Sequence, residues 1–147
     1  MRNLILLLHL FAAIVWLGGM VFAHFCLRPS VAMLEPPKRL ALMAATLTRF
    51  FNIVIVAIVI LLATGVQLYI ARDGAAAAAI GMHLMSGIGI AMMLLFGHLF
   101  FGPFRRMKAA VIAEAWPVAA TQLGMIRVLV LANMILGFLA VSAVRLL

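Results

Sequence analysis

Four histidines are the residues of this sequence best suited to chemistry, because a neutral imidazole is a common ligand of iron and copper. His9 and His24 lie in one long apolar stretch, His83 and His98 lie in another, and the members of each pair stand fifteen positions apart. Fifteen residues of α-helix rise about 22 Å, so each stretch would carry one imidazole near each face of a membrane. The spacing predicts two layers, His9 with His83 and His24 with His98.

Haem b fits these two layers. In an up-down-up-down four-helix bundle the first and third helices lie on a diagonal about 13 Å long, across which two imidazoles can ligate one iron. The sequence therefore predicts a membrane b-type cytochrome with two haems, each held by two histidines, that moves electrons across the membrane. Trp16 would line a cofactor, and Arg28, Arg105 and Arg127 would pair with the haem propionates. Five glycines on the histidine-bearing helices would give the macrocycle close backbone approach: Gly18, Gly19, Gly87, Gly89 and Gly97.

Copper is an alternative metal for the same side chains. Methionine occurs eleven times, and its thioether is a soft donor that suits copper, as does imidazole. Met82 and Met85 lie beside His83, and Met20 lies close to His24. A copper-handling membrane protein is therefore the second hypothesis, and a structural subunit without a cofactor is the third.

Catalytic machinery is not recognisable in the sequence. It has no paired carboxylates, no nucleophile triad and no nucleotide-binding loop, and its three acidic residues fall in predicted loops. The enzyme class that the histidines allow is a haem-dependent membrane oxidoreductase, and no catalytic residue can be named. The single cysteine, Cys26, excludes an internal disulfide and a thiolate metal cluster.

The composition identifies lipid as the solvent for the elements that carry these residues. Of 147 residues, 69% are hydrophobic and 10% are charged, whereas soluble domains are about half apolar and a quarter charged. A water-soluble globule is excluded because so few charges cannot cover its surface. The net charge of +8 comes from basic residues placed between apolar stretches, without interleaved aromatics, and this excludes nucleic-acid binding.

Four apolar runs can each cross a hydrocarbon core of about 30 Å, which takes about 20 helical residues. They are Leu4–Leu27, Phe50–Ala71, a segment within Gly74–Phe104, and a segment that begins soon after Pro117 and ends at Val144. We expect one all-α domain over residues 1–147, an integral membrane bundle with up-down-up-down topology. Gly102 and Pro103 would close the third helix, and Met33–Arg49 would lie on the membrane surface or extend the second helix.

Basic residues near the helix ends predict the orientation of the bundle. Seven lie on one side, at Arg28, Lys38, Arg39, Arg49, Arg105, Arg106 and Lys108, and three lie on the other, at Arg2, Arg72 and Arg145. By the positive-inside rule, the first and third loops would be cytoplasmic and both termini would lie outside, in the periplasm of a bacterial-type inner (plasma) membrane. The expected partners are the lipid bilayer, a quinone or a periplasmic redox protein, and a second copy of the chain.

The first helix carries an order of residues that resembles the opening of a known family. His9, Trp16, Gly18, Gly19, Phe22, Leu27, Arg28 and Pro29 follow one another as in the CopD-like (copper-resistance D) membrane proteins. Later stretches resemble the short four-helix members of that family: Arg49–Phe51 to Gly65, His98–Pro103 with Arg105 and Arg106, and Ile126–Arg127 to Asn133 and Gly137. The resemblance implies a four-helix integral membrane protein and a link to copper.

A more distant likeness is to the HemJ-type protoporphyrinogen oxidases. Their first helix has a similar order of His, Trp, Gly and Arg and binds haem, which implies haem chemistry for His9. The pattern of that family also includes a lysine in the third helix, and the third helix here has none before Lys108. The resemblance to these oxidases therefore implies haem binding but not the oxidase reaction.

Overall fold

The computed structural model describes residues 1–71 and 80–146, and in these residues the chain is helical throughout, without a strand. The first span comprises α1 (Arg2–Phe22), the π-helical turn η1 (Ala23–Leu27) and α2 (Arg28–Val31), and the second is α3 (Pro36–Ile70). The third comprises α4 (Ile80–Leu99), the π-helical turn η3 (Phe100–Phe104) and α5 (Arg105–Ile112), and the fourth is α6 (Trp116–Leu146). All four are long and apolar enough to cross a membrane. The predicted all-α membrane fold is confirmed.

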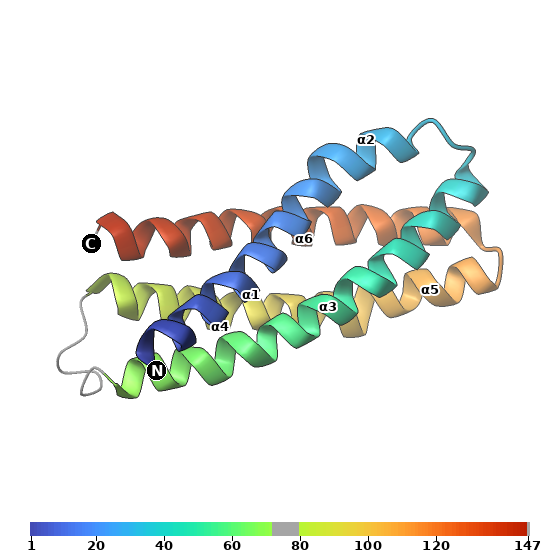
Figure 1. Ribbon diagram of the computed structural model, residues 1–147. Coiled ribbons are helices and arrows are strands. Elements are labelled where there is room, and N and C mark those ends of the chain that lie inside the picture. Colours follow the sequence, from blue (N-terminus) through green and yellow to red (C-terminus); the bar gives the residue numbers. More distant parts are fainter. Residues whose placement is uncertain (72–79, 147) are drawn as a thin grey trace.

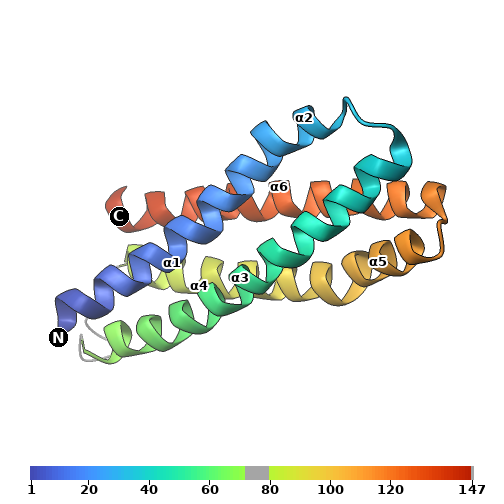
Figure 2. The same ribbon diagram turned by 45° about the vertical axis from the view of Figure 1, so that its right-hand side comes forward.

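The four spans form two antiparallel pairs. α1 packs along α3, and α4 packs along α6, so that one pair lies over the other (Figures 1 and 2). Both chain ends lie at one end of the bundle, which we call the terminal end (Figure 1). The opposite end carries α2, α5 and most of the basic residues, and we call it the arginine-rich end.

The second span extends well beyond its apolar part. α3 begins at Pro36 and runs for 35 residues, about 52 Å, so it is longer than a hydrocarbon core of about 30 Å. Pro36 and Pro37 occupy its first turn, where a missing amide proton costs no hydrogen bond, and Glu35 before them is extended. Of the two predictions for Met33–Arg49, the extension of the second helix is therefore the one that the structure confirms.

The third span does not end at Gly102 and Pro103, and the prediction that it does was wrong. The chain stays helical to Ile112, with Pro103 inside the wider turn η3. A π-helical turn shifts the hydrogen-bond register, so it can absorb a proline that would break a regular helix. The first span behaves in the same way, since η1 precedes Pro29 and the helix continues to Val31.

Aromatic rings fill the middle of the bundle. Phe51 of α3 is only 1% exposed, and its ring lies edge-on to Phe96 at 5.4 Å and to Phe104 at 4.7 Å between centroids. Trp16 of α1 meets Phe96 of α4 at 6.1 Å, also edge-on, a geometry favoured by the ring quadrupoles. This aromatic core, defined here as these four residues, separates the two ends of the bundle.

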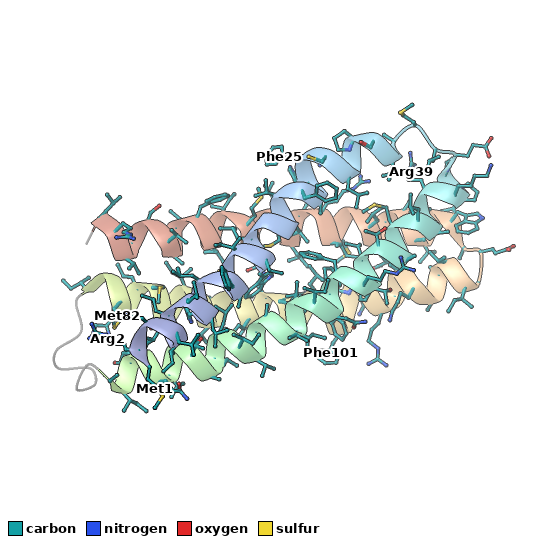
Figure 3. All side chains as sticks on the ribbon, viewed as in Figure 1. Met1, Arg2, Phe25, Arg39, Met82 and Phe101 are labelled. Carbon is teal, nitrogen blue, oxygen red and sulfur yellow. The ribbon has the colours of Figure 1, made fainter. Side chains whose placement is uncertain are left out.

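Large apolar side chains cover the outside of the spans. Phe25 and Phe101 point away from the bundle (Figure 3) and are 62% and 68% exposed. Leu94 on α4 is 71% exposed. In water such a surface would aggregate, whereas in a bilayer it contacts acyl chains. A lipid bilayer is thus the environment of this protein.

Candidate functional site

At the terminal end, His9 is held by a hydrogen bond to the second span. Its Nδ1 lies 2.8 Å from Oγ1 of Thr64 on α3. The Thr64 hydroxyl donates its single proton to the carbonyl oxygen of Ile60 at 2.6 Å. Thr64 Oγ1 must therefore accept from His9 Nδ1–H, and this tautomer leaves the lone pair on His9 Nε2. Histidines that bind metals through Nε2 are fixed in this way by a partner on Nδ1.

The neighbouring glycine gives the His9 ring its place on α3. A Cβ added at Gly65 would lie 3.5 Å from Cε1 of His9, so the imidazole rests directly on the helix backbone. His9 is half-buried, and Thr64 is buried at 6% exposure. Thr64 and Gly65 were not predicted as site residues, although a hydroxyl in an apolar span is a signal that a partner is needed.

His83, the predicted partner of His9, also lies against α3. Its exposed ring contacts Tyr69 edge-on at 5.9 Å between centroids. Met82 and Met85, the predicted copper donors beside it, are half-buried on α4, and Figure 3 shows Met82 at the terminal end. The last turns of α3 thus hold one histidine from α1 and one from α4.

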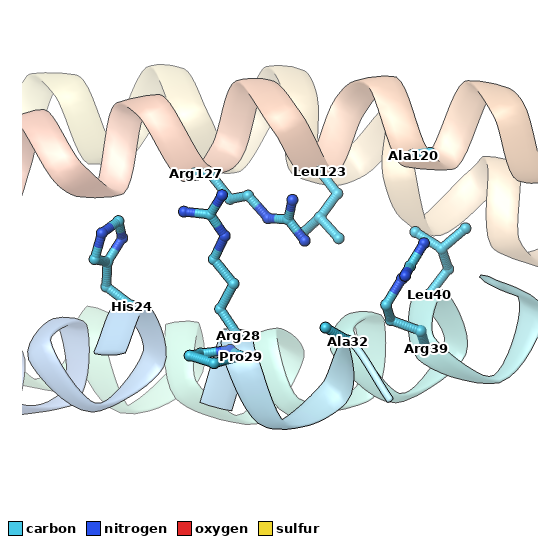
Figure 4. Close-up of a pocket in the computed structure, with 9 residues that line it drawn as sticks. All are labelled: His24, Arg28, Pro29, Ala32, Arg39, Leu40, Ala120, Leu123 and Arg127. Atoms are coloured by element: carbon cyan, nitrogen blue, oxygen red, sulfur yellow. The ribbon is translucent and has the colours of Figure 1, made fainter. Parts of the chain in front are cut away.

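At the arginine-rich end, His24 lines a cavity of about 480 Å³. It lies in the π-helical turn η1, with its ring edge-on to Phe25 at 4.9 Å. Arg28 and Arg127, predicted as propionate partners, line the same cavity, and so does Arg39. Figure 4 shows His24, Arg28 and Arg39 extending toward α6, where Arg127 forms the opposite wall.

The other predicted site residues lie elsewhere. His98 and Arg105 are exposed on the third span and do not line the cavity that contains His24. Trp16 is buried in the aromatic core at 4% exposure, where it packs on Phe96. The ligation of two haems by His9 with His83 and by His24 with His98 stays a prediction.

The five glycines on the histidine-bearing helices differ in what lies beside them. A Cβ at Gly19 would overlap the ring of Phe50 on α3, so α1 and α3 need a glycine there. At the other four, a Cβ would meet nothing within 4 Å: Gly18, Gly87, Gly89 and Gly97. Open space beside these four glycines neither fills nor blocks the place of a macrocycle, so the close approach of a haem to them stays a prediction.

His, Cys, Asp and Glu are the residue types that most often bind metals in proteins. No group of three or more His, Cys, Asp and Glu residues lies close enough together to hold a metal ion in residues 1–71 and 80–146. Copper(I) does not require such a group, since it accepts thioether sulfur together with imidazole nitrogen. Methionines beside a histidine, as on α4, therefore fit copper(I) better than zinc or non-haem iron.

Four apolar spans with polar side chains at both ends define a multi-pass helical membrane protein. A family model described as Copper resistance protein D matches residues 44–147. The chain therefore belongs to the CopD family, and it is a copper-resistance-related membrane protein. No curated protein and no solved structure matches it. The matched region includes His83, His98, Arg105 and Arg127, whereas His9, Trp16, His24 and Arg28 precede it.

Proposed function

We propose that this protein binds copper(I) at the terminal end of the bundle, with His9 as the principal ligand. The observation that carries the proposal is the hydrogen-bond relay from His9 Nδ1 through Thr64 Oγ1 to the carbonyl of Ile60. The relay fixes the ring and leaves His9 Nε2 able to donate its lone pair.

The remaining donors come from α4. His83 lies against Tyr69 on the same part of α3, and Met82 and Met85 lie within the same turn of α4 as His83. Imidazole and thioether are neutral, soft donors, so together they favour Cu(I) over Mg²⁺ or Ca²⁺. With the predicted orientation, this site would face the periplasm and take copper from that side.

Binding at one end fits the molecule better than conduction of copper along its axis. The aromatic core fills the middle of the bundle, with Phe51 at 1% and Trp16 at 4% exposure. Beyond the core, the cavity that contains His24 is lined by Arg28, Arg39 and Arg127, which repel a cation. We therefore assign copper to the terminal end and not to His24.

A competition titration tests this function. The purified protein in detergent is titrated with Cu(I) against a chromophoric chelator, and His9→Ala is compared with His98→Ala. His98 is an exposed histidine without a hydrogen bond to the described residues, so it controls for loss of an imidazole as such. We expect one high-affinity Cu(I) per chain, with affinity reduced about 100-fold or more in His9→Ala and unchanged in His98→Ala. Equal affinity of His9→Ala and wild type would refute the assignment.

The same preparations test the two-haem prediction. Two haems would give a Soret band and a sharp reduced-minus-oxidised difference spectrum, and His98→Ala would remove one haem and spare the other. On the copper proposal, the protein as purified has no Soret band, and His98→Ala changes nothing in the visible spectrum. The two hypotheses thus differ most clearly at His98.

A further inference from the structure

Three guanidinium groups from three helical segments converge on the cavity at the arginine-rich end. Arg28 comes from α2, Arg39 from α3 and Arg127 from α6, and they line the same space of about 480 Å³ (Figure 4). Nε of Arg127 is buried and has no hydrogen-bond partner in the described part of the chain. Arg127, which lines the cavity, therefore keeps one buried donor whose hydrogen bond is unmade.

Among residues 1–71 and 80–146, no acidic side chain lies beside this cluster of positive charge or lines the cavity. The two described acids, Glu35 and Glu114, are exposed in the turns that precede α3 and α6. Arg28 is exposed and Arg39 and Arg127 are half-buried, so the three like charges repel one another in partly solvated surroundings, and a bound anion would offset that repulsion. The arrangement therefore fits a bound anion.

The depth of Arg127 strengthens this conclusion. It lies eleven residues after Trp116, the first residue of α6, which places it about 16 Å along the helix axis. It is thus inside the fourth candidate span and not at its end. Ionisable residues within such spans are rare and usually serve function, and basic pockets between membrane helices bind anionic headgroups.

We propose that this cavity binds a phosphate group. The planar fork of arginine matches two phosphate oxygens at once, and three such groups can surround one phosphate. The rest of the lining is largely apolar and suits the glycerol and first methylenes of a lipid: Pro29, Ala32, Leu40, Ala120 and Leu123. Ala32 and Ala120 are exposed, so the cavity opens to the surface. The phosphate can belong to an anionic phospholipid or be free inorganic phosphate, and neither source depends on copper binding.

Native mass spectrometry of the detergent-purified protein tests the site and distinguishes its sources. In the first arm phosphatidylglycerol is added, and in the second the zwitterionic phosphatidylcholine is added. In a third arm inorganic phosphate is added, and the melting temperature of the protein is measured by a separate thermal-shift assay. Each arm compares wild type with Arg127→Gln. The matched control is Arg106→Gln, which removes one charge at the same end from an exposed residue outside the cavity.

We expect phosphatidylglycerol to bind wild type and Arg106→Gln with the same affinity. Its affinity for Arg127→Gln should be lower by a factor of about ten or more. Retention of phosphatidylglycerol over phosphatidylcholine identifies a lipid, whereas stabilisation by inorganic phosphate alone, lost in Arg127→Gln, identifies free phosphate. Equal loss in Arg106→Gln, or no binding in any arm, overturns the site. So does a haem in the purified protein that Arg127→Gln releases, because the arginines would then hold propionates. If Arg127→Gln does not fold, Arg39→Gln at the half-buried wall replaces it.

Discussion

The two ends of the bundle handle their polar groups in opposite ways. At the terminal end, hydrogen bonds join His9 to Thr64 and Thr64 to Ile60. His9 Nε2 is left as a neutral nitrogen that can give its lone pair to a metal. At the arginine-rich end, Arg28 and Arg127 line an open cavity with a buried donor unpaired. The first arrangement suits a soft cation and the second an anion. The difference teaches that one small bundle can keep ligands of opposite charge apart, because its aromatic core lies between them.

The largest effect is expected when that core is broken. Phe51 contacts the rings of Phe96 and Phe104, so Phe51→Ala leaves a cavity and should lower the free energy of unfolding by about 3 to 5 kcal/mol. Unfolding in detergent with increasing denaturant, followed by circular dichroism, measures the loss. Phe101→Ala is the control, since Phe101 is exposed toward lipid. A similar cost for both variants would contradict the packing of Phe51 in the aromatic core.

The second-largest loss of stability is expected from a larger side chain placed between the first two spans. In Gly19→Leu the new side chain must displace the ring of Phe50, which should cost about 1 to 3 kcal/mol of stability. Gly18→Leu adds the same side chain where nothing lies within 4 Å, so its unfolding curve should match that of wild type. If Gly19→Leu weakens phosphate binding but leaves the Cu(I) affinity at His9 unchanged, the two ends of the bundle bind their ligands independently. Equal stability of the two variants would contradict the close approach of α1 and α3.

Much of the fold could be predicted because hydropathy and proline position act locally. The four spans follow from apolar length, and the start of α3 follows from Pro36. The continuation of the third span through Pro103 could not be predicted, because a π-helical turn depends on how the helix packs. The predicted turn after the second span, with Arg72, lies outside the described residues.

The candidate site was only partly predictable for a related reason. Histidines and arginines stand out in an apolar sequence, so His9, His24 and Arg127 were found from residue type alone. Their partners were not found, because Thr64 and Arg39 meet them only after helices distant in sequence have packed. Spacing along a helix fixes depth in the membrane, but it does not fix which neighbour a side chain faces.

Removal of the hydroxyl that holds His9 should have a smaller effect than the core and Gly19→Leu variants. Thr64→Val leaves His9 in place without its Nδ1 partner, and loss of such a partner lowers metal affinity about tenfold. Thr48→Val is the matched control, because Thr48 also donates to its own helix, at Ala44. The chelator competition assay reads both. If Thr48→Val and Thr64→Val lower Cu(I) affinity equally, the relay has no role in the site.

The smallest effect is expected at His98. It is exposed on α4, so His98→Ala should change the free energy of unfolding by less than about 0.5 kcal/mol and leave copper and phosphate binding intact. Thermal melting and the two binding assays check this. Loss of a bound haem in this variant would instead restore the two-layer histidine hypothesis and remove the contrast between the ends.

X-ray absorption spectroscopy of the Cu(I)-loaded protein tests the central claim most directly. For wild type we predict a nitrogen shell at about 2.0 Å and a sulfur shell at about 2.3 Å, from imidazole and thioether donors. The nitrogen shell should weaken in His9→Ala and persist in His98→Ala. A spectrum that is the same in wild type and His9→Ala would contradict the claim that His9 binds the copper.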